Sequence, residues 1–255
     1  MNPNRAAAVK LVAAAATIAA ILVSGLALAF YFAFTDTAPA PTDTAAHSTP
    51  PSGVGVRDRI AEQPMPQVSP EDATGGTPAL VPAAAMTLPP PTVLGPAGIP
   101  AGFPNTAEGA IAQLAQILVS ALGRMDLEHA REVREAWFED PDSDGVWPVM
   151  LLVQRFLEEA GMPLGLEAPA TLTVAPVGAQ VKGSDGPDWT VACVLLDVTY
   201  THVQTARMAY GHCERMAWTG GRWVVAEGSH PPPAPSTWPG TDLAREAGWL
   251  TWVEG

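Results

Sequence analysis

The feature that most constrains this chain is an uncharged run of 24 consecutive residues, Leu11 to Phe34. A helix of about 20 apolar residues crosses the hydrocarbon core of a bilayer. Arg5 and Lys10 precede the run, and the first acidic residue of the chain, Asp36, follows it. Because basic residues that flank such a helix stay in the cytoplasm, we expect a cytoplasmic tail over residues 1–10 and a transmembrane helix over residues 11–34. The rest of the chain would then lie outside the cytoplasm.

A cleaved signal peptide is the alternative interpretation of this segment. Residues 27–29 (Ala-Leu-Ala) have the small-residue spacing of a cleavage site. The apolar core of a signal peptide is usually about 7–15 residues long, whereas this run is longer and continues past that site. We therefore favour a retained, single-pass anchor in the cell membrane, and cleavage stays open as the second possibility.

Acidic residues dominate the chain beyond the expected anchor. All 26 Asp and Glu residues but only 11 of the 13 Lys and Arg residues lie there, a formal charge of −15. A surface of this sign repels phosphate, so we expect no nucleic-acid partner. It also disfavours binding to anionic lipid, which leaves residues 11–34 as the expected contact with the membrane.

Residues 35–101 have the composition of a linker. The segment is rich in Pro, Ala, Thr and Gly and contains no Phe, Trp or Tyr. Such a sequence buries too little apolar surface to offset its ordering entropy, and each proline removes a backbone donor. We therefore expect a disordered linker that separates the anchor from a folded domain.

Residues 102–255 are expected to form one extracytoplasmic α+β domain. Its first half has apolar residues at helical spacing, and Asn105 and Glu108 have the spacing of a capping box. Asp126 and Pro148 are typical first residues of the next two helices. Gly123 and Gly161 are expected to end the first and the third. The predicted helices cover residues 105–123, 126–137 and 148–161.

The second half of this domain changes to the two-residue period of strands. Gly220 and Gly221 accept the positive φ angles of a tight hairpin turn, which sets Trp218 opposite Trp223. We expect three helices packed on a curved, four-stranded antiparallel sheet. The predicted strands cover residues 170–181, 189–200, 207–218 and 222–226.

Cys193 and Cys213 are the two cysteines of the chain. If the second and third strands meet at a loop centred on residues 202–204, these cysteines face each other across the pair. Opposed positions in antiparallel strands bring the Cβ atoms within about 5 Å, and an exported domain is in an oxidising compartment. We expect a disulfide, with two buried free thiols as the alternative.

Asp140, Asp142 and Asp144 precede Gly145 with the spacing that opens an EF-hand calcium loop. The twelfth position, where a bidentate glutamate is required, is Leu151. We expect a solvated turn between two helices, with the three aspartates as weak calcium candidates, and predict no metal site and no cofactor.

Four polar residues on the predicted strands are the acid–base candidates if the domain is an enzyme. They are Asp197, Tyr200, Tyr210 and His212. No second motif accompanies them, and side chains of this kind in strands are more often hydrogen-bonded parts of the structure. We therefore predict no catalytic residue and a domain that is not an enzyme.

Three tryptophans lie in the segment that follows the last predicted strand. A proline run at residues 231–233 begins this tail, and Trp238, Trp249 and Trp252 follow it. Disordered segments rarely keep so many tryptophans, so we expect the tail to fold back onto the domain. The alternative is an exposed aromatic patch that binds a partner.

Several local strings are similar to uncharacterised proteins of mobile elements in high-GC Gram-positive bacteria. They are Gly-Phe-Pro-Asn-Thr-Ala-Glu-Gly-Ala at 102–110, Trp-Thr-Gly-Gly-Arg-Trp at 218–223, Trp-Pro-Gly at 238–240 and Ala-Gly-Trp at 247–249. With its anchor, linker and helices-then-strands order, the chain resembles membrane-anchored scaffold subunits of Gram-positive conjugation and type IV secretion systems. Their heads have the cone-shaped fold of the nuclear transport factor two superfamily, which is cystatin-like. The tryptophan-bearing tail departs from that pattern.

The resemblance implies a non-enzymatic scaffold or adaptor of an envelope complex that takes part in conjugative DNA transfer. Its partners would be other membrane and envelope subunits or further copies of the chain, and it carries over no catalytic residue. The rival interpretation is an extracytoplasmic small-molecule-binding protein or isomerase-like enzyme that uses the mouth of the cone. That rival requires a deep apolar pocket into which Asp197, Tyr210 or His212 points.

Overall fold

The computed structural model describes residues 55–255, apart from 144 and 163–164. The predicted cytoplasmic tail, the predicted transmembrane helix at 11–34 and the first part of the predicted linker lie outside the described residues. Among the helices of the described residues, none is both long enough and apolar enough to cross a membrane.

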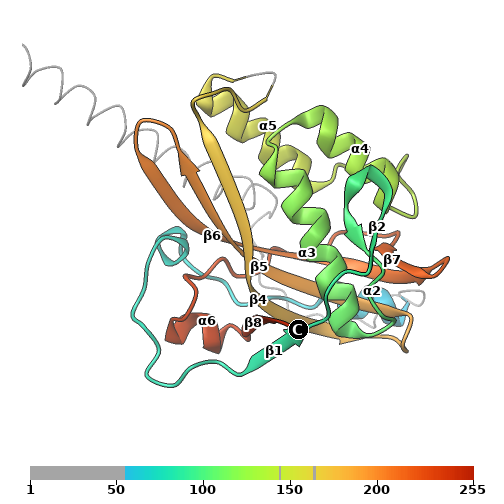
Figure 1. Ribbon diagram of the computed structural model, residues 1–255. Coiled ribbons are helices and arrows are strands. Elements are labelled where there is room, and N and C mark those ends of the chain that lie inside the picture. The colour runs from blue at the N-terminus through green and yellow to red at the C-terminus, as the bar shows by residue number, and fades with distance from the viewer. Residues whose placement is uncertain (1–54, 144, 163–164) are drawn as a thin grey trace, which may run out of the picture.

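A strongly curled sheet forms the centre of the domain (Figure 1). In the described part of the chain it has six strands in the order β1-β8-β4-β5-β6-β7. The pair β1–β8 is parallel, and the other neighbours are antiparallel. The strands are β1 Ala85–Leu88, β4 Thr171–Ser184, β5 Trp189–Thr201, β6 Thr205–Thr219, β7 Arg222–Val225 and β8 Leu250–Glu254. A separate two-stranded ribbon pairs β2 Val93–Leu94 with β3 Pro100–Ala101.

The mixed α+β class and the four predicted strands are confirmed, but the predicted number of strands is wrong. The predicted strands correspond to β4, β5, β6 and β7, and Trp218 faces Trp223 across the Gly220–Gly221 turn. The two additional strands are short and lie at one edge. β8 comes from the tryptophan-bearing tail and β1 from the predicted linker, so neither has the long alternating pattern by which the other strands are recognised.

Three helices cover one face of the sheet, as predicted (Figure 1). They are α3 Ala107–Gly123, α4 Leu127–Trp137 and α5 Pro148–Ala160. Asp126 caps α4 by accepting a hydrogen bond from the backbone of His129. The cap of α3 is Thr106 rather than the predicted Asn105, whose side chain instead donates to Asp188 across 2.6 Å.

Alternation along β5 and β6 divides the core into two layers. Val194, Leu196 and Tyr210 face the helices and pack with Trp137, Trp147 and Trp223. The intervening residues, which include Cys193, Leu195 and Cys213, face the other side of the sheet. Both faces of the sheet are therefore buried, which a simple cone with one covered face would not require.

The second face is covered by segments from both ends of the described chain. The N-terminal part supplies α2 Val56–Glu62, with Ala61 and Met65 buried, and the C-terminal part supplies α6 Asp242–Glu246, with Ala244 and Trp249 buried. The 3₁₀ helices η1 Pro70–Ala73 and η2 Pro96–Gly98 lie in the same N-terminal part.

The prediction of a disordered linker at 35–101 is therefore wrong for residues 56–101. Two ion pairs attach α2 to the rest of the domain: Arg57 pairs with Asp185 in the β4–β5 turn, and Asp58 pairs with Arg215 on β6. The segment has too little apolar surface to fold alone. It is ordered because it shares a core with the rest of the domain.

Candidate functional site

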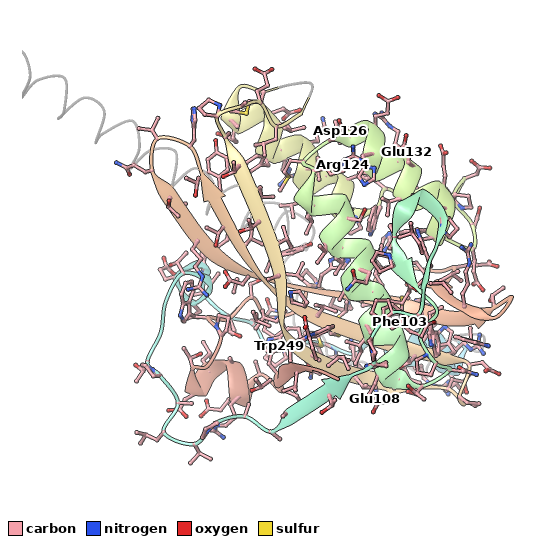
Figure 2. All side chains as sticks on the ribbon, in the orientation of Figure 1. Phe103, Glu108, Arg124, Asp126, Glu132 and Trp249 are labelled. Atoms are coloured by element: carbon pink, nitrogen blue, oxygen red, sulfur yellow. A yellow bond between two sulfur atoms is a disulfide. The ribbon has the colours of Figure 1, made fainter. Side chains whose placement is uncertain are left out.

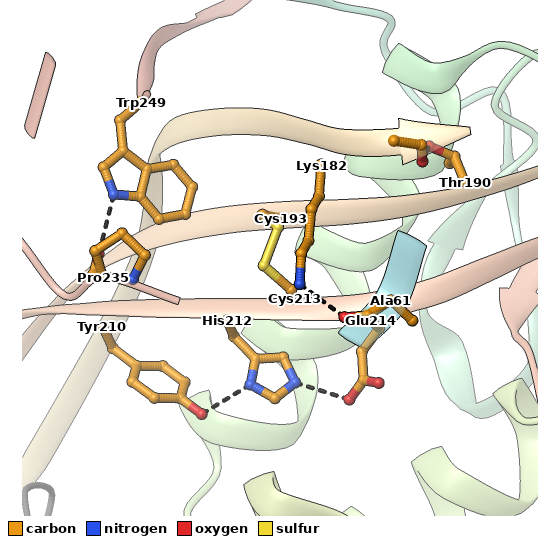
Figure 3. Close-up of a disulfide and its surroundings, with 11 residues drawn as sticks. Ala61, Lys182, Thr190, Cys193, Tyr210, His212, Cys213, Glu214, Pro235 and Trp249 are labelled. Atoms are coloured by element: carbon orange, nitrogen blue, oxygen red, sulfur yellow. Dashed lines mark hydrogen bonds and ion pairs between the residues drawn. A yellow bond between two sulfur atoms is a disulfide. The ribbon is translucent and has the colours of Figure 1, made fainter. Parts of the chain in front are cut away.

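Three polar side chains lie in a row on the helix-facing side of β6 (Figure 3). The hydroxyl oxygen of Tyr210 is 2.9 Å from Nδ1 of His212, and Nε2 of His212 is 2.8 Å from Oε1 of Glu214. The two-residue spacing of a strand places all three on one face. Tyr210 and Glu214 are each 1% exposed, so the row lies inside the core.

Glu214 is the centre of this buried cluster. Its Oε1 also accepts a hydrogen bond from the indole of Trp147 across 2.9 Å, and its Oε2 lies 3.1 Å from Nδ1 of His230. Burial raises the pKa of Glu214, but the hydrogen bonds and charges of His212 and His230 outweigh it and lower the pKa to about 2. The carboxylate is therefore ionised and accepts hydrogen bonds through both of its oxygens.

The groups around Glu214 respond to its charge. Burial, and then the negative charge of Glu214, raise the pKa of Tyr210, so its hydroxyl stays protonated. Burial alone would lower the pKa of His230, but the hydrogen bond and charge of Glu214 give a net increase. Arg134 and Arg215 oppose that increase. Tyr210 therefore stays protonated and Glu214 stays ionised near neutral pH, so this pair suits a structural polar network better than a catalytic base.

The structure brings together two of the four predicted acid–base candidates, Tyr210 and His212, and separates the others. Asp197 lies on the opposite face of the sheet, where it pairs with Arg207. Tyr200 faces the helices, and its ring packs edge-on against Phe156 with 5.3 Å between the centroids.

Glu214, His230 and Trp147 were not among the predicted site residues. Glu214 could have been recognised from the two-residue period of a strand, because it follows Tyr210 and His212 on the same face. His230 and Trp147 reach the cluster only through tertiary packing, so no local pattern identifies them.

The disulfide predicted between Cys193 and Cys213 is confirmed (Figure 3). The loop between β5 and β6 lies at residues 202–204, and the two cysteines are directly paired in the register. They face the second core layer, under α2 and the tail. The bond therefore crosslinks the neighbouring strands β5 and β6 beneath the segments that come from the two ends of the described residues.

In the acidic loop that was the weak calcium candidate, the guanidinium of Arg134 is hydrogen-bonded to the backbone. Nη2 of Arg134 donates to the carbonyl oxygens of Ser143 and Gly145 across 2.9 and 2.8 Å. Asp140 and Asp142 form the turn, and Asp144 lies outside the described residues. No cluster of three His, Cys, Asp or Glu side chains suited to a metal ion occurs among the described residues.

The tail that carries the three tryptophans packs on the domain. Trp249 is buried next to α6 (Figure 2), and its indole donates to the carbonyl oxygen of Pro235 across 2.9 Å. The guanidinium of Arg207 lies over the ring of Trp238, 4.8 Å from its centroid. Trp252 lies in β8 and packs against the helix-facing core. The role of these tryptophans in binding a partner stays a prediction.

A cavity of about 260 Å³ lies between the tail and the N-terminal segment on the second face. Trp249, Leu195 and Val177 supply large apolar surface, and Thr241 and Arg245 are the polar residues of α6 and its cap. The remaining lining residues are alanine, glycine and proline residues and two residues of β8: Ala79, Pro82, Ala83, Gly178, Pro239, Gly240, Ala244, Leu250 and Thr251.

Comparison of the chain with protein-family models, with curated proteins and with solved structures gives no match. The resemblance to conjugation scaffolds therefore stays a prediction, and the function has to be argued from the chain itself.

Proposed function

We propose that this chain is a non-enzymatic, single-pass membrane-anchored scaffold or adaptor of an envelope complex, and that this complex is a conjugative, type IV secretion-like DNA-transfer machinery. The anchor is residues 11–34, and the domain described above is its extracytoplasmic head. The partners are other membrane or envelope subunits or further copies of the chain.

The observation that carries this proposal is that the polar side chains of the buried acid–base cluster are hydrogen-bonded to one another within the protein. His212 uses both ring nitrogens, and Glu214 uses both oxygens, in hydrogen bonds within the protein. A catalytic group has to reach a substrate, whereas these groups hold α5, β6 and the start of the tail together. The strongest candidate for chemistry in the head therefore has a structural task.

Exposed apolar side chains in an uncharged segment provide the surface that a scaffold needs. Residues 73–107 contain no charged side chain, although the head is strongly acidic. Leu80 is 94% exposed, and Val81, Val93 and Leu94 are also exposed. Exposed apolar side chains in an uncharged stretch of the chain are typical of surfaces on which a second protein packs.

Site-specific photocrosslinking in cell membranes tests this proposal. A photoreactive residue at Leu80 or Leu94 of the full-length chain is expected to give discrete adducts whose mass-spectrometric identity is an envelope subunit or a second copy. Val203, also exposed but in the β5–β6 loop outside the uncharged segment, is the matched control and should give none. Monomeric chains without adducts at Leu80 and Leu94 would contradict the proposal.

The cavity favours a second candidate function, extracytoplasmic binding of a compact apolar molecule. Its lining is largely apolar, as ligand sites usually are. It lies on the face of the sheet opposite Tyr210 and His212, so it supports binding rather than isomerase-like acid–base catalysis. Ala244→Leu, which fills the cavity, should abolish binding of small aromatic probes measured by NMR, and a wild-type chain that binds none of them removes this candidate.

A further inference from the structure

The segment from His230 to Trp249 crosses the second face as a strap with three points of attachment. At its start, His230 contacts Glu214. In the middle, the hydroxyl of Ser236 accepts a hydrogen bond from the backbone of Gly211 on β6 across 3.0 Å. At its end, Trp249 is buried in the second core layer, and its indole donates to the carbonyl oxygen of Pro235 within the strap itself.

The strap lies unusually close to β6. A Cβ atom at position 211 would lie 2.8 Å from the carbonyl oxygen of Pro235 and 3.1 Å from that of Ala234, so glycine is required beneath the strap. Beneath and beside it lie the buried disulfide, Leu195 and Ala209. Movement of the strap would therefore uncover the apolar second face.

The attachment at His230 differs from the other two because it contains a titratable pair at the boundary between core and solvent. The side chain of Glu214 is 2% exposed and that of His230 is 28% exposed. A proton can thus reach His230 from solvent while its partner stays buried. A hydrogen bond between two ionised groups is roughly twice as strong as one between neutral groups.

The other charged and titratable groups around this pair come from three elements. His212 on β6 bonds to the same carboxylate, with Tyr210 behind it. Arg215 on β6 and Arg134 on α4 disfavour a positive His230, and Asp58 of α2 offsets Arg215 through a 2.6 Å ion pair. Glu214 outweighs the two arginines because its carboxylate is hydrogen-bonded to the imidazole.

We propose that His230 and Glu214 form a proton-controlled latch for the strap. The strap is held closed when the imidazole of His230 carries a proton and loosens when that proton is lost. The folded-state pKa of His230 lies above its unfolded value of 6.5, so this contribution is complete below pH 6.5 and is lost as the pH rises through the folded-state pKa.

Hydrogen–deuterium exchange of the full-length chain between pH 5.5 and 8.5, corrected for intrinsic rates, tests the latch. Protection of peptides from residues 231–249 should fall about fivefold over this range in the wild type, the difference expected between a charge-assisted and a neutral hydrogen bond. His230→Gln should show the low protection at every pH. His202→Gln, in the exposed β5–β6 loop, should match the wild type.

Two results would overturn the latch: strap protection in the wild type that does not change with pH, or a pH profile that survives in His230→Gln. If His230→Gln does not fold, the titration of the His230 imidazole in the wild type, followed by NMR, tests the latch instead. A midpoint above the value of about 6.5 for a free histidine supports the latch, and a midpoint at or below it rejects the latch.

Discussion

The indole of Trp147 donates a hydrogen bond to the carboxylate of Glu214 across 2.9 Å, although the two residues are 67 positions apart. Trp147 immediately precedes α5, and Glu214 lies in the middle of β6. The contact thus attaches the helical layer to the sheet through an ionised group inside the core. Such a group is tolerated because Trp147, His212 and His230 form hydrogen bonds with its two oxygens.

Replacing Glu214 should strongly destabilise the fold. Glu214→Ala leaves the donors of Trp147, His212 and His230 without an acceptor, and removal of one partner from a buried ionic cluster costs about 3–5 kcal/mol. Urea unfolding at pH 7 measures the loss. Glu246→Ala, a surface variant on α6, should stay within about 0.5 kcal/mol of the wild type. A loss below about 1 kcal/mol for Glu214→Ala would show that the cluster does not carry the stability assigned to it.

The same carboxylate should make stability depend on acid pH. Its pKa is lowered from 4.5 to about 2 in the folded protein, so its contribution is present above pH 4.5 and is lost as the pH falls towards 2. Glu214→Gln lacks this titration. The free energies of unfolding of the wild type and Glu214→Gln, measured by urea at several pH values, should therefore converge between pH 4.5 and 2. A constant difference across that range would contradict the lowered pKa.

The central strands and the helices were predictable because their determinants are local. Gly220 and Gly221 take φ angles of 61° and 82°, which fixes the hairpin and sets Trp218 opposite Trp223. The turn at residues 202–204 likewise fixes the register that pairs Cys193 with Cys213. Once a turn is recognised, the two-residue period of the strands determines which side chains meet.

The edge of the sheet and most of the buried cluster were not predictable, because their determinants lie far apart in the sequence. β1 pairs with β8, so Met86 lies beside Trp252, a partner from the far end of the chain. The composition of residues 35–101 indicated disorder, because composition reflects only the apolar surface that a segment can bury by itself. Ala61 and Leu88 are buried against surfaces that other parts of the chain provide. His230 reaches Glu214 in the same way, through a crossing that no periodicity encodes.

Loss of the disulfide should destabilise the domain without changing its fold. The bond closes a loop of 20 residues, for which chain-entropy estimates give about 3 kcal/mol. The double variant Cys193→Ala/Cys213→Ala should unfold at correspondingly lower urea concentration and show unchanged circular dichroism. The wild type in a strong reductant should approach the same midpoint, while the double variant should not respond to reductant. Equal midpoints for the wild type and the double variant without reductant would contradict the prediction.

Docking of α2 on the sheet can be tested at Gly183. A Cβ atom there would lie 2.6 Å from Cγ2 of Ile60, so Gly183→Ala should displace α2 and cost about 1–3 kcal/mol. Hydrogen exchange of residues 56–62 should increase in this variant. Adding Ile60→Ala removes the clash and should recover part of the protection. Gly123→Ala, at a position with no neighbouring atom within 4 Å, is the control. Unchanged exchange of α2 in Gly183→Ala would show that the helix does not pack there.

Lys182 should titrate well below an ordinary lysine. Its ammonium donates to the carbonyl oxygen of Ala61 across 2.7 Å, and burial lowers its pKa from 10.5 to about 8. Because the folded-state pKa is below the unfolded value, the buried charge disfavours folding below pH 8, and that penalty disappears as the pH rises from 8 to 10.5. Stability relative to Lys182→Met should accordingly increase over that interval.

Amine chemistry provides a direct measurement, because the chain has one other lysine, Lys10. Acetylation followed by peptide mass spectrometry should show a midpoint near pH 8 for Lys182 in the folded full-length chain. In urea the same residue should shift towards 10.5, since unfolding removes the burial that lowers its pKa. A midpoint near 10.5 in the folded chain would mean that Lys182 is solvated, and the contact that fastens the end of α2 to β4 would then have to be abandoned.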